Sequence, residues 1–394
     1  MYFPLLLPES ESELNLRVAK ARKAMEAHKL EAMLIVSSAN MFYFAGGIFN
    51  GYIWLSLTDG PIFFVVPPLK TDSPLSRSIR KPEQIPAMLA DEGIRIPKRV
   101  GLEFDDLLYT EVKRLSGLFP DSEIADASVA MRECRAVKTP YELKVMREDG
   151  RKQAAVYSRI PHCYQEGMTD LEFQIEIEHV LRREGCLGFP RVAGRRMEIN
   201  LGSVLAGENA DEPSPYDFSM GGAGADPSLP VGASGTIMHP GIAVMVDMNG
   251  GFNGYQTDMT RVWSIEGLPK IAYDAHQCSC DILRDLEKFG RPGVEIGDLY
   301  RRSRRLAEDA GLSEYFMGHN HQVKFIGHGV GIQLNEIPVI MERNRGLLAE
   351  NMTIAIEPKF VLPGVGAVGV ENTYIVTPDG LENITPLDED IHEL

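Results

Sequence analysis

Two strand-like stretches that each contain one acidic residue decide the fold of this chain. Residues 244–248 read Val-Met-Val-Asp-Met, and residues 257–261 read Thr-Asp-Met-Thr-Arg. Both stretches are typical of β-strands, the first of them apolar, and the glycines at 250–251 supply a turn between them. Because the strands of such a hairpin run antiparallel, we expect Asp247 and Asp258 to lie opposite one another. A carboxylate inside an apolar strand is costly to desolvate unless it is paired or binds a cation.

Two further acids repeat this pattern later in the chain, and a histidine lies among glycines. Glu357 ends the run Ile-Ala-Ile-Glu, Glu371 ends the run Val-Gly-Val-Glu, and His328 stands in Gly-His-Gly-Val-Gly. Any one of these residues alone has an ordinary structural explanation. Four converging carboxylates would repel one another strongly, however, and divalent cations would relieve that repulsion. The set therefore predicts a site for two divalent ions, of Mn²⁺, Co²⁺, Fe²⁺ or Zn²⁺.

The composition restricts the class of protein and the partners to consider. The 394 residues are 44% hydrophobic and 24% charged, which is ordinary for a globular protein of about two or three domains. A formal net charge of −16 argues against a nucleic-acid partner. No apolar run reaches the roughly 18–20 residues of a membrane-spanning helix, and the short start Met1–Pro8 lacks the features of a signal peptide. The five scattered cysteines do not suggest a disulfide framework, so we expect a cytoplasmic protein.

The distribution of predicted elements indicates two domains, over 1–132 and 133–394. The first alternates helices with strands, as α/β domains do. The second is predicted to be α+β and has a strong helix start at Thr139-Pro140-Tyr141-Glu142. Its Gly-, Pro- and Ser-rich stretch 202–241 predicts a long loop that either covers a substrate or is a surface insertion. Helices are predicted over residues 11–28, 107–118, 140–160, 169–184, 269–289 and 296–311. Strands are predicted over residues 32–36, 52–57, 61–66, 99–103, 242–248, 254–264, 323–326, 330–334, 352–360 and 366–377.

The motifs, in this order, resemble the pita-bread metallopeptidase family, which includes methionine aminopeptidase, aminopeptidase P, prolidase and the metal-free relative creatinase. The resemblance covers roughly residues 135–394. The matching segments are Val246–Gly250, Gly254–Arg261, Gly327–Gly331, Ile356–Pro358 and Glu371–Thr377. The stretches Asn40–Gly47 and Arg135–Glu142 resemble the smaller front domain of aminopeptidase P and creatinase, so the two-domain branch is favoured.

The resemblance implies a role for each of the five residues. Asp247 would chelate one metal ion, and Asp258 and Glu371 would bridge both ions. His328 and Glu357 would complete the ligands of the other ion, with Glu357 as the proton shuttle. The two ions would activate a water molecule for attack on the carbonyl before a proline, in a short peptide with a free N-terminus. The resemblance also implies a homodimer.

Two departures from the family pattern fall where hydrolytic members usually carry histidine. Asn335 follows the Gly-His-Gly motif, and Ser214 stands in Pro-Ser-Pro-Tyr upstream of the first aspartate. Asn335 can donate a hydrogen bond to an oxyanion but cannot carry a proton at neutral pH. His321 is the nearest candidate to replace a lost histidine, and it is otherwise an ordinary polar residue on a loop.

We therefore expect a metal-dependent hydrolase of short peptides, of the Xaa-Pro aminopeptidase or dipeptidase kind, in which Glu357, His321 and Asn335 are the candidate catalytic residues. The departures leave a second possibility, a metal-dependent lyase or hydrolase of a small non-peptide substrate, for which the dimethylsulfoniopropionate lyases of this fold are a precedent. A third is a non-catalytic relative that binds peptides, although such a protein has no chemical need for five metal ligands.

Overall fold

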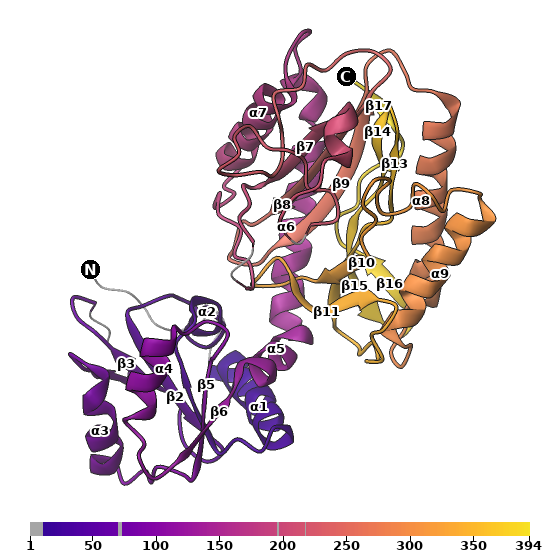
Figure 1. Ribbon diagram of the computed structural model, residues 1–394. Helices are drawn as coiled ribbons and strands as arrows, with labels where there is room; N and C mark the ends of the chain where they lie inside the picture. The colour runs from indigo at the N-terminus through magenta and orange to yellow at the C-terminus, as the bar shows by residue number, and fades with distance from the viewer. Residues whose placement is uncertain (1–10, 70–72, 195–196, 217) are drawn as a thin grey trace. The chain divides into compact units, whose positions relative to one another are not determined.

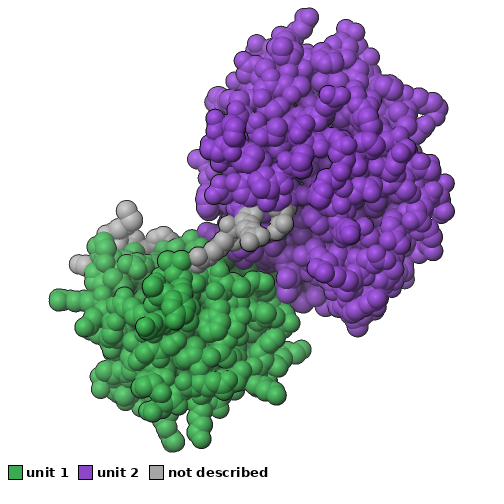
Figure 2. Space-filling model, in the orientation of Figure 1, with its two compact units in different colours: residues 1–135 green, residues 136–394 purple. Residues whose placement is uncertain are grey.

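The computed structural model describes residues 11–69, 73–194, 197–216 and 218–394, so the apolar start Met1–Pro8 lies outside the described residues. The chain divides into two compact units, Met1–Arg135 and Ala136–Leu394, which Figure 2 colours separately. The boundary predicted from the sequence lies between residues 132 and 133. Within the described part of the chain, no helix has both the length and the apolar character needed to cross a bilayer.

The N-terminal unit is an α/β domain built on one mixed sheet with the strand order β4-β3-β2-β1-β5-β6. Its strands are β1 (Ala32–Ile35), β2 (Gly51–Ser56), β3 (Ile62–Val65), β4 (Ser76–Ser78), β5 (Arg99–Leu102) and β6 (Glu123–Asp126). Its helices are α1 (Glu11–Ala27), α2 (Ser38–Ala45), α3 (Ile85–Asp91), α4 (Tyr109–Ser116) and α5 (Ser128–Ala136). The antiparallel pairing of β2 with β3 confirms the strand pair predicted on either side of the turn at 58–60.

The C-terminal unit is an α+β domain in which helices pack against two larger sheets, with the strand orders β17-β9-β8-β7 and β11-β10-β12-β15-β16. The strands are β7 (Gly202–Ala206), β8 (Ala243–Gly250), β9 (Thr257–Ser264), β10 (Phe325–Gly329), β11 (Glu336–Met341), β12 (Thr353–Ile356), β13 (Lys359–Leu362), β14 (Gly366–Gly369), β15 (Asn372–Thr377), β16 (Gly380–Asn383) and β17 (His392–Glu393). The helices are α6 (Pro140–Tyr157), α7 (Asp170–Arg183), α8 (Lys270–Phe289) and α9 (Ile296–Asp309). In Figure 1, α6 and α7 lie beside β7 and β8, whereas α8 and α9 lie on the other side of the unit.

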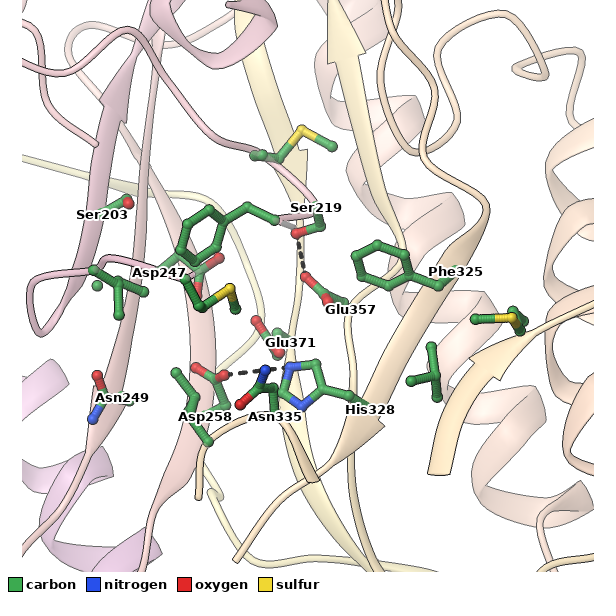
Figure 3. A pocket seen from close by; sticks show the side chains of 18 of the residues that line it. Ser203, Ser219, Asp247, Asn249, Asp258, Phe325, His328, Asn335, Glu357 and Glu371 are labelled. Carbon is green, nitrogen blue, oxygen red and sulfur yellow. Dashed lines mark hydrogen bonds and ion pairs between the residues drawn. The ribbon is translucent and has the colours of Figure 1, made fainter. Parts of the chain in front are cut away.

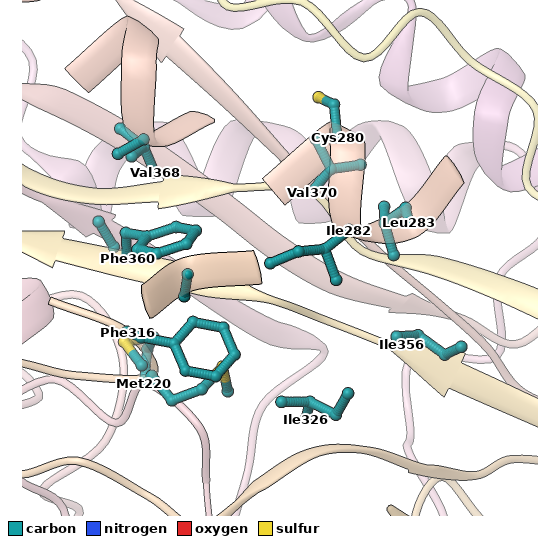
Figure 4. Close-up of a cluster of buried hydrophobic side chains, with 14 of the residues drawn as sticks. Met220, Cys280, Ile282, Leu283, Phe316, Ile326, Ile356, Phe360, Val368 and Val370 are labelled. Carbon is teal, nitrogen blue, oxygen red and sulfur yellow. The ribbon is translucent and has the colours of Figure 1, made fainter. Parts of the chain in front are cut away.

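A large apolar cluster holds the strands that carry the acidic residues (Figure 4). It joins Met245 of β8 to Ile356 of β12, and it also includes Val370, which directly precedes Glu371. Each such side chain contributes roughly 1.5–3 kcal/mol when it is fully buried. The cluster thereby fixes the backbone on which the polar site is built.

The helix start at Thr139 is confirmed, and several predicted strands need correction. The Thr139 hydroxyl accepts a hydrogen bond from the Glu142 amide at 3.2 Å, and the Glu142 carboxylate accepts one from the Thr139 amide at 2.9 Å. The strand predicted over 330–334 is wrong, because residues 331–335 form bends and β11 begins only at Glu336. The stretch 202–241 does not begin as a loop, since its first five residues pair with β8 as the buried strand β7.

The long strands predicted over 352–360 and 366–377 are each interrupted at an acid. The first breaks at Glu357 and Pro358, between β12 and β13, because proline has no N–H group to continue the ladder. The second breaks between β14 and β15, where Glu371 forms only an isolated bridge with Thr260 of β9. Both breaks place a carboxylate where strands of different sheets meet.

Candidate metal centre

The hairpin of β8 and β9 positions the two aspartates, but not directly opposite one another as expected. In the observed register Asp247 pairs with Thr260, and Asp258 pairs with Asn249. Residues two apart on a strand share a face, so Asp247 and Asp258 are diagonal neighbours on the same face of the hairpin. Their carboxylates can therefore serve one site together.

Glu371 reaches the same site through a dense set of hydrogen bonds. The Thr260 hydroxyl donates to Glu371 Oε2 at 2.7 Å. The buried guanidinium of Arg261 donates to the backbone carbonyl oxygen of Glu371 at 2.9 Å and to the side chain of Asn372 at 2.9 Å. Arg261 is thus a positioning residue for the segment that carries Glu371.

His328 and Glu357 come from neighbouring strands, β10 and the end of β12. Glycines flank His328 because the strands approach closely there: a Cβ at Gly327 would lie 2.1 Å from the Ala355 carbonyl oxygen. His328 Nδ1 lies 3.1 Å from the Gly329 carbonyl oxygen, and Nε2 lies 3.7 Å from Asp258 Oδ2. A ring that donates from Nδ1 presents its Nε2 lone pair to the site, as metal-bound histidines do.

The structure brings all five predicted ligands together (Figure 3). One ligand atom each from Asp258, His328 and Glu371 lie within 4.8 Å of one another, and so do atoms from Asp247, Glu357 and Glu371. Glu371 belongs to both groups. This arrangement offers two adjacent positions for a cation.

A lysine that the sequence reasoning missed lies in the second of these groups. Lys359 Nζ donates to Asp247 Oδ2 at 2.6 Å, to Glu357 Oε2 at 2.7 Å and to Glu371 Oε2 at 3.2 Å. The side chain is fully buried. A signal was present, because Lys359 follows Glu357 by two residues in a strand-like stretch and such residues share a face. Ser219 also joins this group by donating to Glu357 Oε2.

The pKa values of the ionisable side chains in the site are shifted by burial and by neighbouring charges, and some of them rise while others fall. Burial, followed by repulsion from the other carboxylates, raises the pKa values of Asp258 and Glu371 well above their ordinary values. Burial alone would raise the pKa of Glu357 as well, but Lys359 and His328 outweigh it and lower that pKa. Burial alone would lower the pKa of Lys359, and the surrounding carboxylates instead raise it well above its ordinary value.

The first group fits a divalent ion better than the second does. Glu371 Oε1 is buried and has no hydrogen-bond partner among the described residues, whereas Oε2 accepts from Thr260 and Lys359. An unpaired buried carboxylate oxygen beside Asp258 and an imidazole is a suitable ligand set for Mn²⁺, Zn²⁺ or Fe²⁺. In the second group, the ammonium of Lys359 already contacts all three carboxylates.

The acids lie on the wall of a cavity of about 440 Å³. Much of the remaining wall is apolar and comes from Met197, Ile199, Phe218, Met220, Phe325, Leu334, Val339 and Met341. Phe218, Ser219 and Met220 belong to the stretch 202–241, so part of that stretch lines the cavity rather than standing apart as a surface insertion. The guanidinium-bearing Arg343 also lines it.

The two replacement positions and His321 lie differently around this cavity. Asn335 lines it, and both ends of its amide bind the backbone of Ala193: Oδ1 accepts at 2.6 Å and Nδ2 donates at 3.1 Å. His321 is exposed and lines a neighbouring pocket together with Ser214. The structure does not bring His321 to the acids, so its catalytic role stays a prediction.

Comparison with known proteins identifies the family. Residues 144–378 match metallopeptidase family M24, and residues 17–137 match the creatinase/prolidase N-terminal domain. The chain belongs to metallopeptidase family M24. The predicted family, the two-domain fold with its C-terminal pita-bread domain, and the metallopeptidase class are thereby confirmed.

Several M24 relatives match over most of the chain. The Xaa-Pro dipeptidase of Pyrococcus horikoshii is 24% identical over 386 residues, which cover 96% of this chain and 99% of the relative. A putative dipeptidase of Bacillus subtilis is 25% identical over 293 residues, which cover 74% of this chain and 72% of the relative. Among solved structures, the Xaa-Pro dipeptidase from Bacillus anthracis has a TM-score of 0.79 at 20% identity, covering 97% of this chain and 100% of that one. The X-Pro aminopeptidase from Thermotoga maritima has a TM-score of 0.74 at 20% identity, and the match covers 94% of this chain and 100% of that one.

Proposed function

We propose that this M24 chain is a divalent-metal-dependent hydrolase of short peptides that carry proline after the scissile bond. The observation that supports this most is the convergence of four carboxylates and His328 on the wall of one cavity. The proline preference is carried over from the names of the relatives, which are Xaa-Pro dipeptidases.

The proposed chemistry assigns distinct tasks to the residues of the site. A divalent ion held by Asp258, His328 and Glu371 would supply Lewis-acid polarisation of a carbonyl and lower the pKa of water. Glu357 would accept a proton at its carboxylate and return it to the departing amine nitrogen. Its contacts with Lys359 and Ser219 favour the ionised form that such a base requires.

The wall of the cavity suits a short peptide. Its apolar side chains can bury a pyrrolidine ring and an apolar first residue. The guanidinium of Arg343 suits the terminal carboxylate of a dipeptide, because guanidinium groups bind carboxylates through paired hydrogen bonds. This wall favours the dipeptidase reaction over removal of the first residue from a long peptide.

One observation favours a second candidate, a lyase or hydrolase of a small non-peptide substrate. The amide of Asn335 is committed to Ala193, and Ser214 donates to the Pro230 carbonyl oxygen at 2.9 Å. Neither replacement position supplies the protonatable group that histidine provides in hydrolytic relatives.

A metal-supplemented peptide screen tests the proposal. Chelator-treated enzyme is given Mn²⁺, Co²⁺, Zn²⁺ or Fe²⁺ and assayed on an Xaa-Pro dipeptide, an Xaa-Pro tripeptide and their N-acetylated forms, with Asp258→Asn as the control. We expect proline release from the dipeptide with at least one metal and no release by the control. Failure with every metal and every peptide would refute the peptidase proposal in favour of the non-peptide reaction or a peptide-binding role.

A further inference from the structure

The buried lysine at the centre of the acid cluster conflicts with the expectation of two metal ions. We propose that the ammonium group of Lys359 takes the place of one ion, so that the centre binds a single divalent cation between Asp258, His328 and Glu371. This inference rests on the metal-binding part of the proposed function and is independent of the substrate.

The ammonium of Lys359 is surrounded by oxygens, because it also donates to the Ser219 hydroxyl oxygen at 3.3 Å. Its Nζ lies 2.6–3.2 Å from one carboxylate oxygen each of Asp247, Glu357 and Glu371. These three residues supply the second of the two candidate metal positions. A transition-metal ion bound there would lie about 2.0–2.2 Å from the same oxygens, so it and the ammonium cannot both occupy the position.

Strand pairing fixes the backbone from which the Lys359 side chain extends. Lys359 pairs with Gly369 in the β13–β14 ladder, and its carbonyl oxygen accepts a hydrogen bond from the Met317 amide at 2.8 Å. An ammonium that left the three carboxylates would need another partner, because an unpaired buried charge is strongly unfavourable. The lysine is therefore a built-in part of the site.

One divalent ion together with this lysine neutralises most of the charge of the four carboxylates. Four ionised carboxylates carry −4, and Lys359 with one divalent ion carries +3, which leaves a residual charge of −1. A second divalent ion added while Lys359 stays would bring this sum to +1. The free ligand atoms agree with a single ion, since Glu371 directs Oε2 to Lys359 and Thr260 and leaves only Oε1 without a partner.

This arrangement changes the role of Asp247. With two ions, Asp247 would be a metal ligand, and its replacement would remove an ion. With Lys359 in place, Asp247 is instead a positioning residue for the ammonium, to which it makes the shortest of the three contacts. The two aspartates of the hairpin should therefore respond differently to replacement.

The number of ions bound per chain tests the proposal without any activity assay. Metal-stripped full-length protein is dialysed against excess Mn²⁺, and bound manganese is measured by plasma mass spectrometry, with affinity from calorimetry. We expect one ion in wild type and in Asp247→Asn, and affinity weakened more than roughly 100-fold in Asp258→Asn. Two ions in wild type, no ion in wild type, or an equal loss in both aspartate variants would overturn the proposal.

Replacing the lysine gives the converse test. Lys359→Met removes the charge with little change of volume, and we expect this variant to bind two ions. Lys138→Met is the matched control, because Lys138 is also buried and pairs with Glu336 at 3.0 Å outside the cluster; we expect it to bind one ion. A single ion in Lys359→Met would overturn the proposal, and if that variant does not fold, the wild-type and aspartate measurements still decide. One bound ion without cleavage of any peptide would refute the proposed function and leave this inference standing.

Discussion

Replacing Lys359 with methionine should destabilise the metal-free protein and increase its response to metal. The change leaves the buried carboxylates of Glu357 and Glu371, and the partly exposed carboxylate of Asp247, without the cation that contacts them. Removing one partner of a buried ion pair typically costs about 3–5 kcal/mol. For a unit of about 260 residues the unfolding entropy is roughly 0.5 kcal/mol/K, so this cost corresponds to a fall in Tm of about 6–9 °C.

The assay is thermal unfolding in chelator and in excess Mn²⁺. A single ion at about 100 times its dissociation constant adds roughly 2.7 kcal/mol, or about 5 °C, to the wild type. Lys359→Met should gain about twice that value, because the vacated position binds a second ion. The loss of Tm that Lys359→Met shows in chelator should become smaller as the pH falls. Protonation of the carboxylates then removes the negative charges that the lysine neutralises in the wild type.

Lys138→Met separates this effect from the general cost of removing a buried lysine. Lys138 pairs with the single buried carboxylate of Glu336, so we expect a comparable loss in chelator but a wild-type gain with Mn²⁺. If Lys359→Met were as stable as wild type in chelator, the ammonium would not be neutralising the cluster, and the reasoning would be refuted.

Four further predictions concern the substrate, the pH dependence of stability and proton release on metal binding. Arg343→Met should raise KM at least about tenfold for an Xaa-Pro dipeptide, since a charged hydrogen bond contributes roughly 1.5–3 kcal/mol. The same change should leave KM for the dipeptide amide unchanged, because the amide has no terminal carboxylate. Equal effects on both substrates would rule out carboxylate recognition by Arg343. Asn335→Ala should raise KM several-fold, because it removes both hydrogen bonds to the backbone of Ala193. The manganese content should stay unaltered, and a parallel loss of manganese would contradict this prediction. Because the pKa values of Asp258 and Glu371 are raised, the metal-free protein should lose stability as the pH rises from about 4 through those raised values. Mn²⁺ binding should release protons, detected as a dependence of the calorimetric heat on buffer ionisation enthalpy, and the absence of proton release would mean that both acids are already ionised.

The sequence singled out the acidic residues that converge on the cavity because most of them interrupt or end an apolar run, whereas their role as metal ligands stays a prediction. Asp247 and Asp258 stand out within their hairpin, and Glu357 and Glu371 end apolar runs. The register of the β8–β9 hairpin could not be predicted in the same way. A shift of the pairing by two residues leaves every side chain on the same face of the sheet, so the apolar pattern does not distinguish the two registers. The observed register therefore places the aspartates diagonally.

Lys359 and the cavity wall were harder to predict, for different reasons. A lysine near a strand end is usually exposed, and only the shared face with Glu357 indicates otherwise. Phe218 and Ser219 come from an irregular stretch whose path follows no periodic pattern, so their approach to Glu357 depends on tertiary contacts. Asn335 lines the cavity, and its catalytic role stays a prediction; its pairing with Ala193 depends on a contact distant in sequence.

The most direct test of the metal centre is anomalous diffraction from a crystal soaked in Mn²⁺. We predict one manganese peak, in contact with Asp258, His328 and Glu371, with the ammonium of Lys359 still between Asp247 and Glu357. A peak between Asp247 and Glu357 with the lysine displaced, or no peak at these acids, would contradict the account.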